Sequence, residues 1–245
     1  MSKIDYIFEG CCTSPEQVLQ ARVSGAVRVE LCSRLEIGGV TPSEELIRAS
    51  LTAASAPKSV LTKMLPNQTL LLDQLSSNDL GIKLNVLVRP RGGDFVYSEK
   101  EVLQMEKDID LCKNLKVDDG RGGLVGVNGV VIGALLPDGG VDLPAMRRLV
   151  AGARPLEVTF HRAFDECRDV AEGLEDVISL GCERLLTSGH QTDAHAGRFT
   201  LGKLVGQAAG RIIILAGCGV RPHNIKEISE ASGAPEFHSS TLTGW

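Results

Sequence analysis

The sequence predicts one α/β domain over residues 1–245, a (β/α)8 TIM-type barrel that is incomplete at its C-terminal end because the last helix is missing. Strand and helix patterns alternate about eight times, which is typical of a parallel sheet. The length of 245 residues suits a single barrel domain, and polar residues gather at only one end of the strands. A doubly wound open sheet is the alternative, disfavoured because no GxGxxG motif follows the first strand.

Composition narrows the class of protein. Hydrophobic residues make up 43% of the chain and aromatic residues only 4%, which predicts a core of aliphatic side chains. A formal net charge of −5 argues against nucleic-acid or anionic-membrane partners, and no apolar run approaches the roughly 20 residues that span a bilayer. Seven scattered cysteines, and a start without signal-peptide organisation, favour a reduced protein in the cytoplasm.

The first third of the chain alternates until an inserted segment interrupts it. A short apolar strand is followed by Ser14-Pro15, a typical helix start, and the next long loop carries Gly38-Gly39. The Leu-rich residues 57–81, with Pro66-Asn67, are predicted to be an inserted excursion with one helical turn. The elements expected around it are strands 4–10 and 26–31 and helices 14–24 and 41–54.

The remaining chain repeats the same unit. Apolar residues recur at helical spacing between residues 98 and 115, and the charged, Gly-rich residues 116–126 are predicted to form a loop. Asp142 is a helix cap, and Gly181 ends a later helix. The elements expected here are strands 82–88, 127–136, 156–161, 184–187, 211–216 and 235–239, and helices 98–115, 142–153, 170–180, 199–209 and 222–231.

Polar residues follow nearly every predicted strand. In a barrel these strand ends meet at one face, which is where function resides in this fold. Each residue alone is explained somewhat better by a turn or by a satisfied buried polar group than by a ligand, but convergence of six or more favours a ligand site. The candidates are Glu9, Glu30, Arg89, Arg91, Asp94, His161, Arg162, Asp165, Ser188, Gly217, Gly219 and His238.

A repeated Glu-x-Cys pattern ends the first two strands. The spacing places Glu9 with Cys11, and Glu30 with Cys32, on one face of each strand. Because adjacent parallel strands lie about 4.8 Å apart, the two thiols could bridge one soft metal such as Cu(I) or Zn. The alternative is that these cysteines are small buried hydrophobes. Cys12 points to the opposite face of its strand from Cys11. Cys112, Cys167 and Cys182 fall on or beside predicted helices, where packing is the better explanation.

The charged candidates indicate an anion site. Arginines such as Arg89, Arg91 and Arg162 suit carboxylate or phosphate ligands. The turn 217–220 resembles the anion site that barrels build before a helix, although its glycines could equally serve a tight strand-to-helix turn. His161, with Glu9 or Glu30, could perform acid–base chemistry as in a metal-free enzyme for a small phosphorylated or carboxylated substrate. An internal ion-pair network at the barrel mouth is an equally good explanation.

Five segments occur in the order VELCSRLEIGGVTPS, VRPRGGDFVYS, VTFHRAFD, LLTSG and EFHSS. Through these segments the chain resembles the CutC copper homeostasis proteins. The resemblance implies a cytoplasmic, homo-oligomeric barrel that binds Cu(I) and needs no organic cofactor. In human-type members two cysteines at the ends of the first two strands are the proposed ligands, and they correspond to Cys11 and Cys32. This chain departs from the family in its longer segments 57–81 and 116–128 and in ending soon after the eighth strand.

Overall fold

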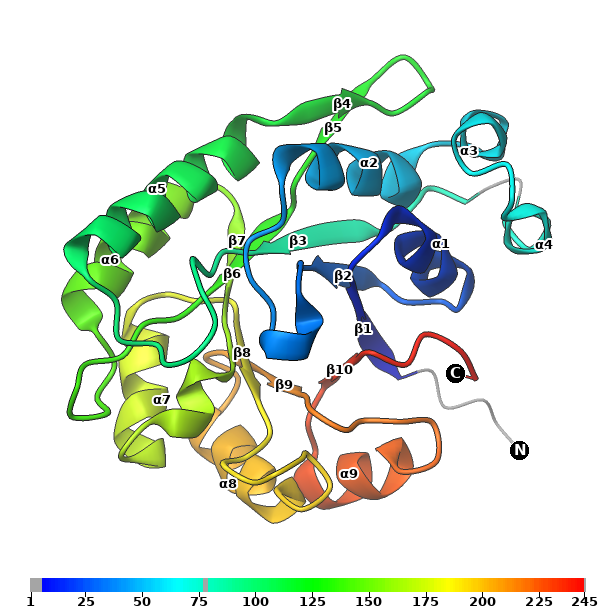
Figure 1. The fold of residues 1–245 in the computed structure, drawn as a ribbon. Coiled ribbons are helices and arrows are strands. Elements are labelled where there is room, and N and C mark those ends of the chain that lie inside the picture. The colour runs from blue at the N-terminus through cyan, green and yellow to red at the C-terminus, as the bar shows by residue number, and fades with distance from the viewer. Residues whose placement is uncertain (1–5, 77–78, 245) are drawn as a thin grey trace.

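Parallel strands close into a barrel in the computed structural model, which describes residues 6–76 and 79–244 (Figure 1). The order around the ring is β1-β10-β9-β8-β7-β6-β3-β2, so β10 closes the barrel on β1 and the predicted fold is confirmed. Of the first predicted strand, Ile4 and Asp5 lie outside the described residues. The strands are β1 (Ile7–Cys12), β2 (Arg28–Leu31), β3 (Lys83–Leu87), β6 (Gly129–Ile132), β7 (Glu157–Phe160), β8 (Arg184–Thr187), β9 (Ile213–Ala216) and β10 (Glu236–Ser239).

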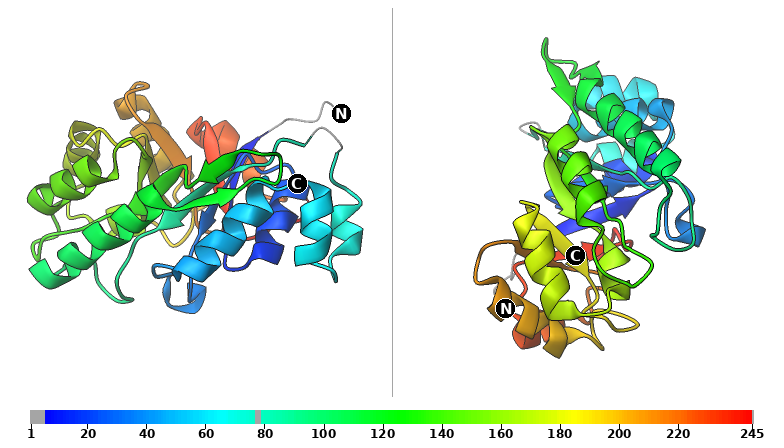
Figure 2. Two further views of the ribbon diagram at one scale, coloured as in Figure 1. Left: turned by 90° about the horizontal axis from the view of Figure 1, so that it is seen from above. Right: turned by 90° about the vertical axis from the view of Figure 1, so that its left-hand side faces the viewer.

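Helices connect the strands and cover the outside of the barrel (Figure 2). Several begin at a side chain that accepts a hydrogen bond from the first turn, as Ser14, Ser43 and Ser98 do. The helices that face the barrel are α1 (Pro15–Val23), α2 (Glu44–Ser55), α5 (Glu99–Asn114), α6 (Leu143–Ala153), α7 (Val170–Ser179), α8 (Arg198–Ala208) and α9 (Ile225–Ser232).

Among the described residues no helix follows β10, in agreement with the sequence. The chain instead returns along the outside of β1, where Leu242 is buried in the main core. Gly10 permits this approach, because a Cβ atom there would lie 2.9 Å from Leu242 Cδ2 and 3.0 Å from Ala21 Cβ. Leu242 therefore covers part of the outer face of β1.

The excursion is more ordered than one helical turn, so that prediction is wrong. It contains two helices, α3 (Lys58–Met64) and α4 (Thr69–Leu72). Their apolar side chains Leu61 and Leu72 form a second small core with Leu19 of α1. Short helices of this kind carry a weak sequence pattern, and packing against α1 stabilises them instead.

The prediction of a loop at residues 116–126 is also wrong. An antiparallel hairpin forms there from β4 (Lys116–Asp118) and β5 (Leu124–Gly126). The Asp119 side chain accepts hydrogen bonds from the backbone N–H groups of Arg121 and Gly123 and so shapes the turn. Both strands are exposed or half-buried, and they therefore lack the apolar alternation by which strands are recognised.

Several predicted boundaries shift by a few residues. The barrel strand expected at residues 127–136 is confined to β6, and α9 begins at Ile225 instead of residue 222. The residues before α9 form a turn in which Asn224 Oδ1 accepts a hydrogen bond from the Arg221 backbone N–H at 2.8 Å. Pro222 therefore lies in the turn that precedes the helix.

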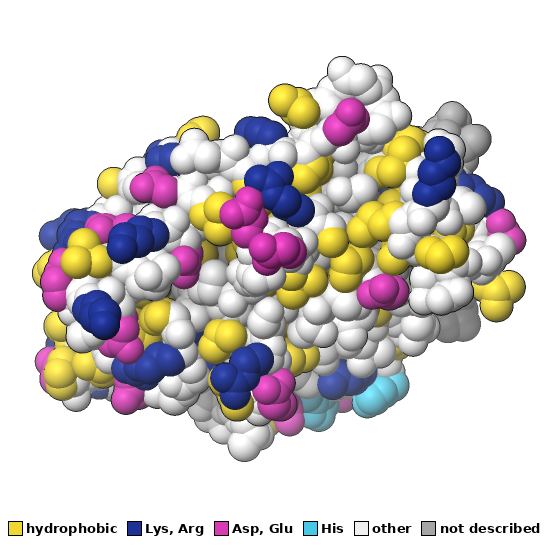
Figure 3. All heavy atoms as spheres, turned by 45° about the horizontal axis from the view of Figure 1, so that its top comes forward, with side chains coloured by type: hydrophobic (Ala, Val, Ile, Leu, Met, Phe, Trp, Pro, Cys, Tyr) yellow, Lys and Arg dark blue, Asp and Glu magenta, His cyan; other side chains and the backbone are white. Residues whose placement is uncertain are grey.

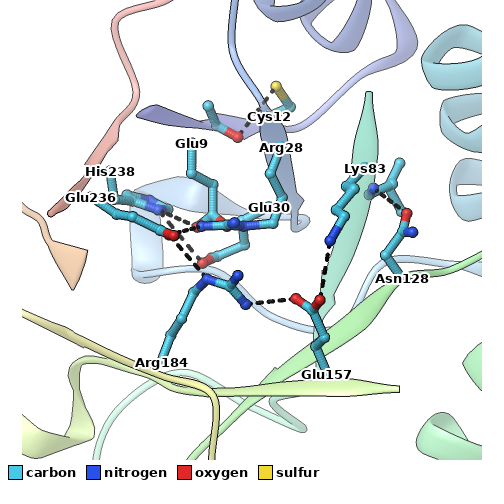
Figure 4. A network of polar contacts seen from close by, with 12 residues as sticks. Glu9, Cys12, Arg28, Glu30, Lys83, Asn128, Glu157, Arg184, Glu236 and His238 are labelled. Atoms are coloured by element: carbon cyan, nitrogen blue, oxygen red, sulfur yellow. Dashed lines mark hydrogen bonds and ion pairs between the residues drawn. The ribbon is translucent and has the colours of Figure 1, made fainter. Parts of the chain in front are cut away.

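Charged side chains fill the interior of the barrel toward the N-terminal ends of its strands, where aliphatic residues are usual (Figure 4). Arg28 on β2 contacts Glu9 on β1 and lies 2.6 Å from Glu236 on β10, whose carboxylate is 3.0 Å from Arg184 on β8. Arg184 in turn lies 2.6 Å from Glu157 on β7. This buried network joins five strands across the barrel and supports the region above it.

The outer surface carries both signs of charge. Figure 3 shows basic and acidic side chains interspersed over one face, without segregation by sign. Arg148, for example, lies 2.9 Å from Glu99 and 3.0 Å from Glu106. Within the described part of the chain, no helix is both long and apolar enough to cross a bilayer.

Candidate functional site

A cavity of about 680 Å³ opens at the C-terminal ends of the barrel strands. This is the face on which the sequence places its polar strand ends, and the volume falls within the range of small-molecule sites. Its lining includes the predicted residues Cys11, Glu30, Arg89, His161, Arg162, Asp165, Gly219 and His238, together with Phe95, Glu166, His190, Gln191, Cys218, Arg221, Ser239 and Ser240.

The two predicted metal-binding cysteines lie together. Their Sγ atoms are 4.0 Å apart, and both side chains are buried with Leu87 and Val131 in a small apolar cluster. The contact with Cys32, burial and the nearby Glu30 carboxylate raise the pKa of the Cys11 thiol well above its usual value. Without a metal the Cys11 thiol is therefore protonated, and a metal ion has to displace that proton.

The other cysteines are placed differently. Cys12 is buried on the outer side of β1, as the sequence predicts, and Cys112, Cys167 and Cys182 are buried away from the cavity. Burial raises the pKa of each of the last three thiols to about 12. Cys218 lies in the cavity lining and donates from Sγ to the Thr192 carbonyl.

Glu9, Glu30 and His238 form a carboxylate–imidazole cluster at the cavity floor. His238 Nδ1 lies 2.8 Å from Glu9 Oε1 and 3.8 Å from Glu30 Oε2. Burial opposes ionisation of Glu9, but Arg28 and His238 hold its pKa at about 2. Burial raises the pKa of Glu30 to about 7, with His238 opposing and Glu9 reinforcing the shift. The two glutamates therefore differ in protonation near neutral pH.

His161 has different partners from those the sequence suggests. Its ring lies beside Phe95, with the ring centroids 5.0 Å apart, and its Nδ1 accepts a hydrogen bond from the Ala163 N–H. Burial and the positive charge of Arg89 lower its pKa to about 3, so the ring is neutral. The proton then resides on Nε2, which has no partner among the described residues. The carboxylates expected beside His161 instead contact His238.

Arg89 lines the cavity, whereas Arg91 and Asp94 do not. The Arg89 guanidinium donates to the carbonyls of Ile37, Gly39 and Gly93, and so holds the rim loops together. Arg91 lies 2.6 Å from Glu101 at the start of α5 and 2.9 Å from Asp94. These arginine contacts connect the loop after β3 to its surroundings.

Asp165 organises the wall opposite the cysteines. Its carboxylate accepts hydrogen bonds from the Thr187 hydroxyl, from the backbone N–H groups of Ser188 and His190, and from Arg162. His190 adopts a φ of 57°, a left-handed conformation that costs energy for this residue type. Ser188 is buried beside Asp165, outside the cavity lining, so its contacts position the loop.

The turn after β9 reaches the cavity only in part. Cys218 and Gly219 have φ values of 72° and 69° and line the cavity, while Gly217 packs beneath Leu186. Arg221 also lines the cavity and was not among the predicted site residues. Its position directly after the glycine-rich turn is the sequence signal that could have identified it.

Comparisons with known proteins agree on one family. The model of the CutC family matches residues 6–65 and 61–243. A family protein CutC from Parabacteroides distasonis is 45% identical over 96% of this chain and 82% of its own length, and one from Bacteroides fragilis is 42% identical over 96% and 80%. A crystal structure described provisionally as the copper homeostasis protein CutC from Streptococcus agalactiae is 26% identical, with a TM-score of 0.76 over 98% of this chain and 100% of that one.

Proposed function

The chain belongs to the CutC family, and on that premise we propose that it is a cytoplasmic copper homeostasis protein that binds Cu(I) through Cys11 and Cys32. The observation that carries the proposal is the 4.0 Å separation of the two sulfur atoms. Two thiolates at about 2.3 Å from one tetrahedral metal lie about 3.8 Å apart, so little movement is required. Thiolates are the ligands that Cu(I) prefers.

The surroundings of the pair also suit a soft ion. Leu87 and Val131 shield the sulfur atoms and offer no oxygen ligands from their side chains, which disfavours hard cations. Cys11 lines the cavity, so an ion can reach the pair from the barrel mouth. The copper is cargo in this proposal, and the protein supplies the two thiolates and a shielded pocket.

Cu(I) titration against a competing chelator under reducing conditions tests this role. The Cys11→Ser/Cys32→Ser double variant is expected to bind Cu(I) at least about 100-fold more weakly. Loss of a single hydrogen-bond partner of a metal ligand already lowers metal affinity about 10- to 100-fold, and here both ligands are lost. Cys182→Ser is the matched control, because it removes a buried thiol before β8, at the opposite end of the barrel. Equal affinity of the double variant and this control would refute the proposal.

A metal-free enzyme for a small phosphorylated or carboxylated substrate is the second candidate. The volume of about 680 Å³ favours it, because a single ion needs far less space. Arg162 and Arg221 lie in the wall and could bind the anionic group. Glu30, with its pKa of about 7, and the neutral His161 would serve as acid–base group and N–H donor.

Thermal shift with inorganic phosphate and a panel of phosphorylated and carboxylated metabolites tests this second role. A ligand at about 100 times its Kd should stabilise the protein by about 2.7 kcal/mol, which corresponds to about 5 to 10 °C for a domain of this size. Arg162→Ala and Arg221→Ala should each reduce that shift, while Arg211→Ala, whose exposed side chain pairs with Glu175, should preserve it. Absence of any shift across the panel would exclude this class of ligand.

A further inference from the structure

We propose that Cys11, Glu30 and His238 form a second metal centre, suited to a divalent ion such as Zn²⁺ and open to the cavity. The three residues come from β1, β2 and β10, which are consecutive strands around the barrel. One potential ligand atom from each lies within 4.8 Å of the others, and all three side chains line the cavity. This centre shares Cys11 with the Cu(I) pair but does not depend on Cu(I) binding.

Glu30 lacks a hydrogen-bond partner where a metal would provide one. The residue is 6% exposed, and its Oε2 atom makes no hydrogen bond within the described chain. His238 Nδ1 lies 3.8 Å from this atom, which is too far for a hydrogen bond. A buried carboxylate oxygen is normally paired or bound to a metal, so this atom is the first reason to expect an ion here.

The ring of His238 is held in place by a buried carboxylate. Its Nδ1 lies 2.8 Å from Glu9, and Glu9 is itself held by Arg28 beneath the cavity floor (Figure 4). Metal-binding histidines usually present one nitrogen to a carboxylate of this kind and the other to the ion. The contact with Glu9 leaves Nε2 of His238 without a carboxylate partner, and the Glu9–Arg28 pair restrains the ring.

The ligand atoms of this centre favour a different ion from the one that the cysteine pair favours. One thiolate, one carboxylate and one imidazole are ligands that suit Zn²⁺, whereas a pair of thiolates favours Cu(I). Cys32 is not among the three, and it does not line the cavity. Three protein ligands with a free position facing a cavity are typical of a catalytic zinc site, in which water or a substrate takes the fourth place.

The two centres can be separated by substitution because each has a ligand that the other lacks. The site formed by Cys11, Glu30 and His238 is called the mixed centre, after its three kinds of ligand. Co²⁺ is a suitable probe for it, since a thiolate ligand produces a charge-transfer band in the near ultraviolet. The wild-type protein, Glu30→Gln, His238→Gln and Cys32→Ser would be titrated with Co²⁺ and, in a parallel competition assay, with Zn²⁺. His223→Ala is the matched control, because this histidine is exposed and lies outside the cavity.

The mixed centre predicts that Glu30→Gln and His238→Gln each weaken Co²⁺ and Zn²⁺ binding by more than about 100-fold, while Cys32→Ser and His223→Ala retain both ions. The same two variants should retain Cu(I) binding, which Cys32→Ser should lose. Far-UV circular dichroism checks that every variant folds. An unchanged charge-transfer band in both Glu30→Gln and His238→Gln would overturn the mixed centre without affecting the proposal for Cu(I).

Discussion

Replacing Arg28 with leucine is expected to lower the free energy of unfolding by about 3 to 5 kcal/mol, the usual cost of removing one member of a buried ion pair. Arg28 is 2% exposed, and its guanidinium contacts both Glu9 and Glu236 inside the barrel. Leucine would leave Glu9 with His238 and Glu236 with Arg184 as their charged partners (Figure 4). Urea denaturation at neutral pH measures the loss.

Arg48→Leu is the matched control for that substitution. Arg48 lies 2.7 Å from Glu44 on the surface of α2, and both side chains are more than 40% exposed, at 48% and 42%. An exposed pair one helical turn apart contributes only about 0.3 to 0.5 kcal/mol. If Arg28→Leu were no more destabilising than Arg48→Leu, the interior charges would be tolerated without pairing, and the network would have no role in stability.

The barrel and its functional face could be predicted because they depend on local patterns. Alternating strand and helix segments identify a parallel barrel, and a period of two places Cys11 and Cys32 on the inner face of their strands. The order β1 beside β2 then brings the two sulfur atoms together. The proximity of the two cysteines could be predicted because it involves consecutive strands.

The interior contacts could not be predicted in the same way. Glu9 and His238 are 229 positions apart in sequence and meet because β10 closes the barrel on β1. Arg28 and Glu236, separated by 208 positions, meet for the same reason. The identity of the partner depends on register and on side-chain length, which a pattern of polar strand ends does not contain. The sequence pattern therefore assigns to His161 carboxylate partners that in the structure belong to His238.

Glu30→Gln is expected to change how stability depends on pH. Burial raises the pKa of Glu30 in the folded protein to about 7 from its usual 4.5. The folded state then binds more protons than the unfolded state between these values, so stability falls as pH rises from about 4.5 to about 7. Glutamine cannot ionise, and the variant should be more stable than wild type above pH 7 by at most about 3 kcal/mol.

The gain of about 3 kcal/mol is an upper limit, because the ionised Glu30 carboxylate also attracts His238. That attraction helps to raise the pKa of His238 against the effect of burial, and glutamine removes it. Urea denaturation at several pH values, in the presence of a chelator, measures the difference without interference from bound metal. The two proteins should converge near pH 4.5, where Glu30 is protonated in the folded state, and Glu230→Gln, an exposed position, should follow wild type throughout. A Glu30→Gln protein less stable than wild type at pH 8 would mean that the ionised carboxylate stabilises the floor of the cavity.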